Sequence, residues 1–243
     1  MIKIKLLRQL EEITKHEKVT GKKYSITDEF ESRVSEFPSQ YAFTMISVPK
    51  VGINPKTSYN TPAGVYCYPL DYQHFMQLMN NKLPFVSKAP YIGLIKLNLS
   101  DPSKWLFFDK DNPGTYEDAT EAIDYLNLLG MDGEALYKRA ARAGKHWRMG
   151  HSARIWDMLF FASEPPSGGL SKNYRTVKWN KLFRNLGYIG AYDNGNGIIH
   201  QSEPTQLVCF EPSAYELVGV YETAILRKQT LQVPEALASR SEA

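Results

Sequence analysis

Short runs of apolar residues occur toward both ends of the chain. In its middle, apolar residues recur at helical spacing. The short runs predict strands at 41–48, 64–68, 90–99, 105–108, 206–210 and 217–221. Helical spacing predicts helices at 2–16, 72–79, 115–129, 132–143, 152–162 and 176–186. In the last helix one face carries Trp179, Leu182, Phe183 and Leu186, and Gly187 ends it. Strands before and after a block of helices indicate an α+β fold rather than alternating βαβ units.

The amino-acid composition indicates what kind of protein this is. The 243 residues are 43% hydrophobic and 12% aromatic, enough for a packed core. Net charge is +3, which allows a nucleic-acid partner without requiring one. Cys67 and Cys209 fall inside predicted strands, so we expect buried thiols, no disulfide and no metal site. The N-terminus lacks a signal-peptide core and no run approaches a membrane span, so we expect a soluble, cytoplasmic protein without membrane contact.

The same patterns divide the chain into three parts. Residues 1–23 are expected to form an amphipathic helix and a polar linker, residues 24–229 the main domain, and residues 230–243 a frayed tail. No GxxxxGK[ST], HExxH or GxSxG pattern occurs in the sequence. P-loop nucleotide hydrolysis, zinc proteolysis and α/β-hydrolase chemistry therefore have no motif support.

A glycine-rich segment from Gly187 to Pro212 joins two predicted strands. The second strand begins at Gln206 and contains the apolar run Leu207–Phe210. The stretch Asp193-Asn-Gly-Asn-Gly197 has the composition of a tight turn, with too few carboxylates for calcium. Polar groups at the mouth of a sheet are costly unless water, a partner or a ligand satisfies them. The four that introduce the second strand are His200, Gln201, Glu203 and Gln206.

A second informative segment is Tyr59-Asn-Thr61-Pro-Ala-Gly64-Val-Tyr66-Cys-Tyr68-Pro. Gly64 has no Cβ, so it permits the backbone to approach a ligand closely. Strand alternation places Val65 and Cys67 on one face, and Tyr66 and Tyr68 on the other. Aromatic rings in this arrangement are suited to hold nicotinamide or adenine.

These two segments resemble elements of the ADP-ribosyltransferase superfamily. Gln201-Ser202-Glu203 is similar to the Gln-x-Glu arrangement that these enzymes place at the entrance to a strand. Gly64–Tyr68 is similar to the Gly-Ile-Tyr-Phe strand of the poly(ADP-ribose) polymerase branch. The resemblance spans residues 41–221 in order. It implies a split mixed β-sheet core with a helical insertion, and a mono-ADP-ribosyltransferase of the phage or mobile-element type that uses NAD as substrate and no metal.

The resemblance also implies roles for single residues. Glu203, with Gln201, would hydrogen-bond the ribose and stabilise the oxocarbenium-like charge that develops as nicotinamide leaves. The ring of Tyr66 would stack on nicotinamide. Further contacts to NAD would come from Ser47, Tyr59, Thr61, Gly64, Tyr68 and His200. Either Ser47 or Thr61 would contact the ribose, and His200 would orient Glu203 or bridge to the substrate.

Two departures from the family pattern leave alternatives open. Pro204 and Thr205 separate Glu203 from the strand, whose first residue is Gln206, so either Glu203 or Gln206 occupies the catalytic place. Strand 41–48 has no His or Arg, which the family's first strand carries. If Gln206 takes the catalytic place, the carboxylate is lost. The alternative function is then an inactive module that binds nucleic acid or a protein partner.

The stretch from Ala135 to Trp156 contains six Lys or Arg residues and no acidic residue. Such a patch is suited to track phosphates, with Trp147 as a stacking platform, or is only a solvated face. The nucleic-acid-binding residues it predicts are Lys138, Arg139, Arg142, Lys145, Trp147 and Arg148. The acceptor of ADP-ribose is accordingly expected to be a protein or a nucleic acid, with an antitoxin or host protein as a further partner.

Overall fold

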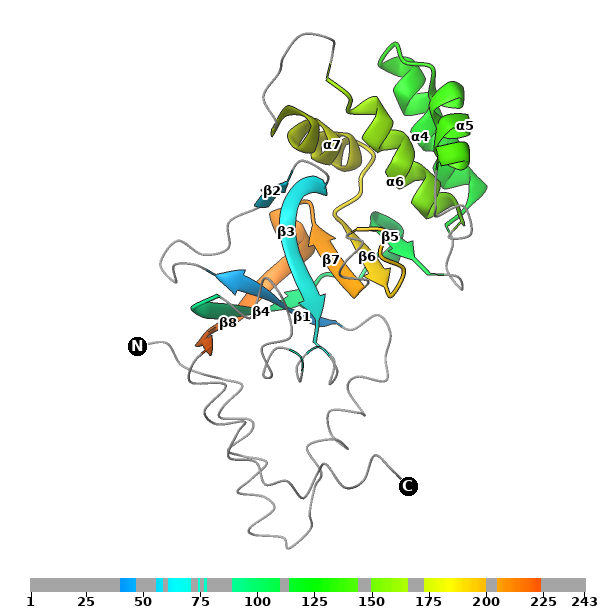
Figure 1. The fold of residues 1–243 in the computed structure, drawn as a ribbon. Coiled ribbons are helices and arrows are strands. Elements are labelled where there is room, and N and C mark those ends of the chain that lie inside the picture. Colours follow the sequence, from blue (N-terminus) through cyan, green and yellow to red (C-terminus); the bar gives the residue numbers. More distant parts are fainter. Residues whose placement is uncertain are drawn as a thin grey trace, which may run out of the picture. The chain divides into compact units, whose positions relative to one another are not determined.

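The computed structural model describes residues 40–46, 56–58, 61–70, 74, 77, 89–109, 114–143, 150–165, 173–199 and 205–223. Its strands are β1 (Tyr41–Ile46), β2 (Lys56–Ser58), β3 (Thr61–Pro69), β4 (Tyr91–Leu97), β5 (Trp105–Phe108), β6 (Gly190–Asn194), β7 (Thr205–Cys209) and β8 (Tyr215–Glu222) (Figure 1). Its helices are α4 (Tyr116–Leu128), α5 (Gly133–Ala143), α6 (Gly150–Ala162) and α7 (Asn173–Asn185), with short 3-10 helices η2 (Pro102–Lys104) and η4 (Pro212–Ala214). The predicted α+β class is confirmed, with parallel and antiparallel strands and one block of helices.

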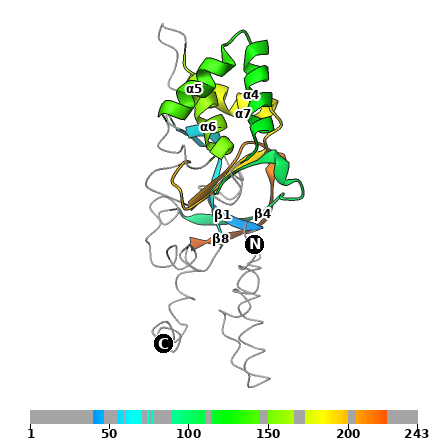
Figure 2. The ribbon, with the colours of Figure 1, turned by 90° about the vertical axis from the view of Figure 1, so that its right-hand side faces the viewer.

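The chain divides into two compact units. The first comprises residues 1–54, 68–97 and 216–243, and the second comprises residues 55–67 and 98–215. Strand β3 contributes to both, because the division falls between Cys67 and Tyr68. Helices α4–α7 belong to the second unit, where they lie together as one group (Figure 1, Figure 2). No helix in the described ranges is long and apolar enough to cross a membrane.

In the second unit the strands follow the order β5-β6-β7-β3, and β2 pairs with β3. Strands β5 and β6 are parallel, with Trp105 opposite Gly190 and Phe108 opposite Asp193. The β6–β7 and β7–β3 pairs are antiparallel. A parallel pair requires a long crossover connection, and the chain segment that contains α4–α7 supplies it between β5 and β6.

Side chains from alternate strand positions and from the helices form the core of the second unit. From the strands come Leu106, Phe108, Ala191 and Val208, and Phe210 follows directly after β7. On the helices Trp156, Trp179 and Phe183 pack as an aromatic cluster, and the Phe183 and Phe210 rings stack with centroids 4.5 Å apart. Burial of such large apolar surfaces is the main favourable term for folding.

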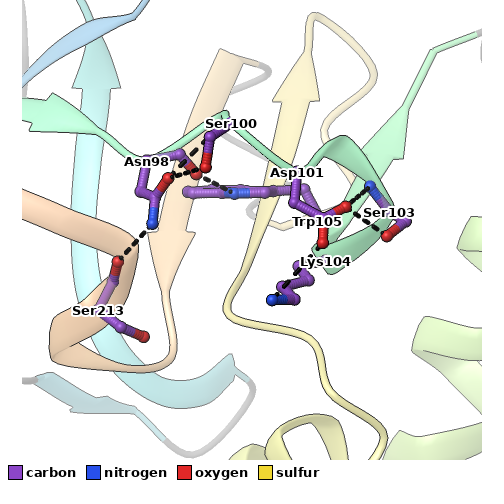
Figure 3. Close-up of polar contacts among 7 residues, drawn as sticks. All are labelled: Asn98, Ser100, Asp101, Ser103, Lys104, Trp105 and Ser213. Carbon is purple, nitrogen blue, oxygen red and sulfur yellow. Dashed lines mark hydrogen bonds and ion pairs between the residues drawn. The ribbon is translucent and has the colours of Figure 1, made fainter.

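A polar network fixes the start of β5 (Figure 3). The indole Nε1 of Trp105 donates to the carbonyl oxygen of Asn98 at 2.8 Å, and the Asn98 side chain donates to the Ser213 carbonyl at 3.2 Å. Asp101 accepts from the backbone N–H and the hydroxyl of Ser103, which caps η2. Nζ of Lys104 lies 3.5 Å from Oδ2 of Asp101 and forms an ion pair with it. The network links the segment before β5 to the one between β7 and β8.

In the first unit the end of β3 is followed by β1, β4 and β8 in that order. Strands β1 and β4 are antiparallel, from Tyr41 opposite Lys96 to Ile46 opposite Tyr91. The Tyr68 ring stacks on Phe43 with centroids 5.7 Å apart. Both side chains are almost fully buried, so this contact is part of the core of the unit.

Local signals in the sequence fix several helix ends as predicted. Thr115 accepts a hydrogen bond from the Asp118 N–H, and the Asp118 carboxylate accepts from the Thr115 N–H, a complete capping box before α4. Gly130 and Gly187 adopt positive φ values of 76° and 86° just after α4 and α7. The predicted apolar face of α7 is also confirmed, since Trp179, Leu182 and Phe183 are buried.

Some predicted boundaries were wrong. No strand was predicted between residues 48 and 64, yet Lys56–Ser58 forms β2. Helices α6 and α7 begin earlier than predicted, at Gly150 and Asn173. Of the helix expected at 72–79, only His74 and Gln77 lie among the described residues, both helical. The helix expected at 2–16, the linker up to residue 23 and the tail at 230–243 lie outside the described residues.

Candidate functional site

Strands β3 and β7, which carry the two segments that the sequence linked to NAD, are direct neighbours. Val65 lies opposite Cys209, Tyr66 opposite Val208, and Cys67 opposite Leu207. Gln206 is the second residue of β7 and is 5% exposed. The thiols of Cys67 and Cys209 are free and buried, as expected. The pairing places the predicted nicotinamide-stacking strand beside the strand that follows Glu203.

Gly64 is required by the packing of these two strands. A Cβ atom added to it would lie 2.6 Å from Cγ2 of Val208 and 2.7 Å from the carbonyl oxygen of Cys209. The sequence suggested that Gly64 admits a ligand to the backbone. On the side where a Cβ would point, the space is instead filled by β7.

Gly64→Ala is expected to lower the free energy of unfolding by about 1 to 3 kcal/mol, because the backbone oxygen of Cys209 cannot move aside without disturbing the strand pair. Gly93→Ala is the matched control, since there the nearest atom is the flexible end of the Ile46 side chain. Urea titration of both variants measures the difference. Equal losses would contradict a special role for the β3–β7 approach.

Tyr66 is held in place by bonds within its own strand. Its hydroxyl donates to the carbonyl oxygen of Pro62. Burial raises the pKa of Tyr66 far above its usual value of 10, and a side-chain hydrogen bond with Thr61 acts in the opposite direction. Strand β3 curves strongly in this part of the chain (Figure 1). Two predicted NAD contacts, Thr61 and Tyr66, are thus brought together.

Tyr68 takes a different place. It belongs to the first unit, is 3% exposed and stacks on Phe43, with His74 at a ring distance of 6.0 Å. Its observed contacts are those of a core residue.

Asp193 is a site residue that sequence reasoning missed. It is fully buried at the end of β6, directly opposite Gln206 on β7. Its Oδ1 accepts from the Asn196 N–H at 2.9 Å, and its Oδ2 accepts from the N–H groups of Ile198 and Ile199. Burial raises its pKa to about 6, against the lowering effect of these hydrogen bonds. The sequence had suggested only a tight turn here.

The loop after β6 is therefore fixed by a carboxylate at its start. Gly195 and Gly197 adopt positive φ values of 90° and 70°, which glycine tolerates best. The Asn196 side chain donates to the carbonyl oxygen of Phe108 on β5. Asn194 lies opposite Thr205, so the β6–β7 pairing fixes both ends of the connection that contains the predicted catalytic segment.

Asn180 on α7 is the second residue that was missed. It is 8% exposed, and its Nδ2 donates to the carbonyl oxygens of Ala63 and, at 3.3 Å, Phe210. It thus joins the helix to β3 and to the residue that directly follows β7. The available signal was an amide beside Trp179 on the apolar face of α7, because such a group needs a buried partner.

Two of the predicted phosphate-binding residues on α5 contact acidic side chains. These acidic residues, Glu134 and Glu164, lie outside the stretch 135–156, which has none. Lys138 lies 3.8 Å from Glu134, one helical turn away. Arg139 forms two hydrogen bonds with Glu164, at 2.9 and 3.3 Å, and its guanidinium lies 4.0 Å from the centre of the Phe161 ring. Arg139 therefore connects α5 to the residues that follow α6. Arg142 is exposed near the end of α5.

The predicted site residues that lie outside the described ranges are Ser47, Tyr59, Lys145, Trp147, Arg148, His200, Gln201 and Glu203.

Among the described residues, no group of three or more His, Cys, Asp or Glu side chains is arranged to hold a metal ion. No protein-family model matches the sequence, and no match was found among curated proteins or solved structures.

Proposed function

We propose that this protein is a mono-ADP-ribosyltransferase that transfers ADP-ribose from NAD to a macromolecular acceptor, a protein or a nucleic acid. The observation that carries the proposal is the antiparallel pairing of β3 and β7. The resemblance to the superfamily links Tyr66 and Glu203 to the same nicotinamide riboside. This requires the strand that contains Tyr66 and the strand that follows Glu203 in the chain to be close to each other. Neighbouring strands within one unit meet that requirement.

The proposed reaction breaks the bond between C1′ of the ribose and the nicotinamide nitrogen. The bonding electron pair leaves with nicotinamide, and positive charge develops on the ribose ring. The carboxylate of Glu203 stabilises that charge and holds a ribose hydroxyl. A nucleophilic atom of the acceptor then bonds to C1′ and loses its proton.

Tyr66 and Thr61 would form the binding surface for the nicotinamide riboside. The hydrogen bonds of Tyr66 with Pro62 and Thr61 hold its ring before substrate arrives. A side chain that is already ordered loses less conformational entropy on binding. Asp193 and Asn180 position the segments on either side through their backbone hydrogen bonds.

The alternative is a module of the same fold class that binds a partner without turning NAD over. Two observations favour it. Strand β1 carries no His or Arg, and its Thr44 is only 2% exposed, so this strand offers no basic group to a dinucleotide. The second observation is that Gln206, which has no carboxylate, lies inside β7. If Gln206 takes the catalytic place, the site has no catalytic carboxylate.

NAD is expected to raise the melting temperature of the protein, because a ligand that binds only the folded state stabilises it, by about 2.7 kcal/mol at a hundred times its Kd. Tyr66→Ala should remove most of that shift, whereas Tyr66→Phe, which keeps the ring and loses only the bonds that hold it in place, should retain a larger part of it. Comparing the NAD-induced increment of each variant corrects for any loss of packing. No shift at millimolar NAD in the wild type would favour the non-catalytic module.

A further inference from the structure

Four side chains from three helices meet where α4 and α6 begin. Tyr116 is the first residue of α4, Tyr137 lies in the middle of α5, and His151 and Arg154 lie in the first two turns of α6. The Tyr137 and His151 rings are stacked with centroids 6.5 Å apart, and Tyr116 meets His151 edge-on at 5.8 Å. All four belong to the second unit, and none is part of the proposed NAD site.

A chain of hydrogen bonds joins Arg154, Tyr137 and His151. Nη1 of Arg154 donates to the Tyr137 hydroxyl oxygen at 3.1 Å, since arginine has no acceptor. The same hydroxyl lies 2.9 Å from Nδ1 of His151. When the Tyr137 hydrogen is directed at Nδ1, the ring proton of His151 lies on Nε2. Burial lowers the pKa of His151, as does the charge of Arg154, against the carboxylate of Asp118; the imidazole is neutral near pH 7 and still a donor.

One donor in the cluster is buried without an acceptor. Nε of Arg154 has no hydrogen-bond partner among the described residues. A guanidinium held in this way is costly unless an anion lies close to it. The nearby Asp118 carboxylate already accepts from the backbone and side chain of Thr115.

An exposed aromatic ring lies beside these donors. Tyr116 is 64% exposed, so much of its side chain is accessible to a planar partner. The first turn of α6 adds the positive end of a helix dipole. Donors for a phosphate next to a ring for a base are the two components from which proteins build sites for single-stranded nucleic acid.

We propose that Tyr116, His151 and Arg154 bind one nucleotide of a single-stranded nucleic acid. Arg154 and His151 take the phosphate, and Tyr116 stacks on the base. Tyr137 holds both donors in position. The inference names the acceptor class of the proposed transferase and rests on it for that role. The binding itself is measured without NAD, so its failure and the failure of NAD turnover are separate results.

The test uses the full chain and fluorescein-labelled ten-nucleotide single-stranded RNA and DNA, with fluorescence anisotropy recorded at several salt concentrations. Tyr116→Ala should weaken binding by about 5-fold or more without changing the salt slope, because stacking contributes about 1–3 kcal/mol per base and releases few counterions. Arg154→Gln should reduce the log–log salt slope by about 0.7, the contribution of one phosphate contact.

Two control variants make the same changes elsewhere. Tyr41→Ala removes a tyrosine that is 39% exposed in the first unit, and Arg184→Gln removes an exposed arginine on α7 that pairs with Glu211. Both should leave binding unchanged. Because Tyr116 is exposed, its variant should fold even if Arg154→Gln does not. Equal affinity of wild type and Tyr116→Ala, losses in the controls as large as in the test variants, or binding to a phosphopeptide in place of the oligonucleotides would overturn the proposal.

Discussion

Glu203→Gln is expected to lower the rate of nicotinamide release from NAD by about 100-fold or more, the usual effect of removing a group that stabilises transition-state charge. Glutamine keeps the size of the side chain and can still hydrogen-bond a hydroxyl, but it carries no negative charge to oppose the ribosyl cation. The melting temperature should barely change, since glutamine has nearly the same size and shape as glutamate. Release of nicotinamide is measured by chromatography at saturating NAD.

Glu211→Gln is the matched control for this variant. Glu211 follows β7 in the same unit and forms an ion pair with Arg184, so the control makes the same chemical change in a carboxylate without a proposed catalytic role and should turn over NAD like the wild type. Wild-type turnover by Glu203→Gln would remove the catalytic role from Glu203. Gln206 would then be the next residue to replace.

Asp193→Ala is expected to lower the free energy of unfolding by roughly 2 to 4 kcal/mol at pH 7. The substitution leaves the N–H groups of Asn196, Ile198 and Ile199 without their acceptor, and each buried unsatisfied group costs about 1–3 kcal/mol. Part of this loss is offset because a desolvated charge is removed. Urea unfolding followed by tryptophan fluorescence measures the change.

The effect of Asp193 should also depend on pH. Its pKa is raised from 3.8 to about 6 in the folded protein, so between about pH 4 and pH 6 the folded state binds more protons than the unfolded state. The stabilisation that Asp193 gives, measured against Asp193→Ala, is therefore largest at low pH and falls as the pH rises through 6. The fall is at most roughly 3 kcal/mol, at 1.36 kcal/mol per pKa unit.

Asp157→Asn is the control for this carboxylate. Burial alone raises the pKa of Asp157 to about 6, and no hydrogen bond to its side chain is found among the described residues. Neutralising it should leave stability at pH 7 unchanged or increase it. A loss as large as that of Asp193→Ala would mean that buried charge, rather than the three backbone hydrogen bonds, accounts for both effects.

Local signals explain what the sequence could predict of the fold. Thr115 with Asp118, and Gly187, fix helix ends through bonds and dihedral angles within a few residues, so they are visible in the sequence. Strand β2 was missed because Lys56–Ser58 has no apolar pattern. Its extended state depends on pairing with β3, which no local property of Lys-Thr-Ser encodes.

The sequence predicted the two segments of the site but not the contacts that hold them in place. The resemblance selected Tyr66 and the strand after Glu203, and the two strands are paired. Asn180 was missed because its acceptors, the carbonyls of Ala63 and Phe210, are distant in sequence and not specific to residue type. The ion pair of Arg139 with Glu164 was missed for the same reason, since the two residues are 25 positions apart.

The most direct test of the account is the fate of NAD labelled separately in its nicotinamide ring and its adenylate group. Purified wild-type protein is incubated with this NAD and a cell lysate, and small molecules, protein and nucleic acid are then separated. The account predicts free labelled nicotinamide together with adenylate label on macromolecules, both absent with Glu203→Gln. NAD recovered intact, with both labels still on one molecule, would contradict it.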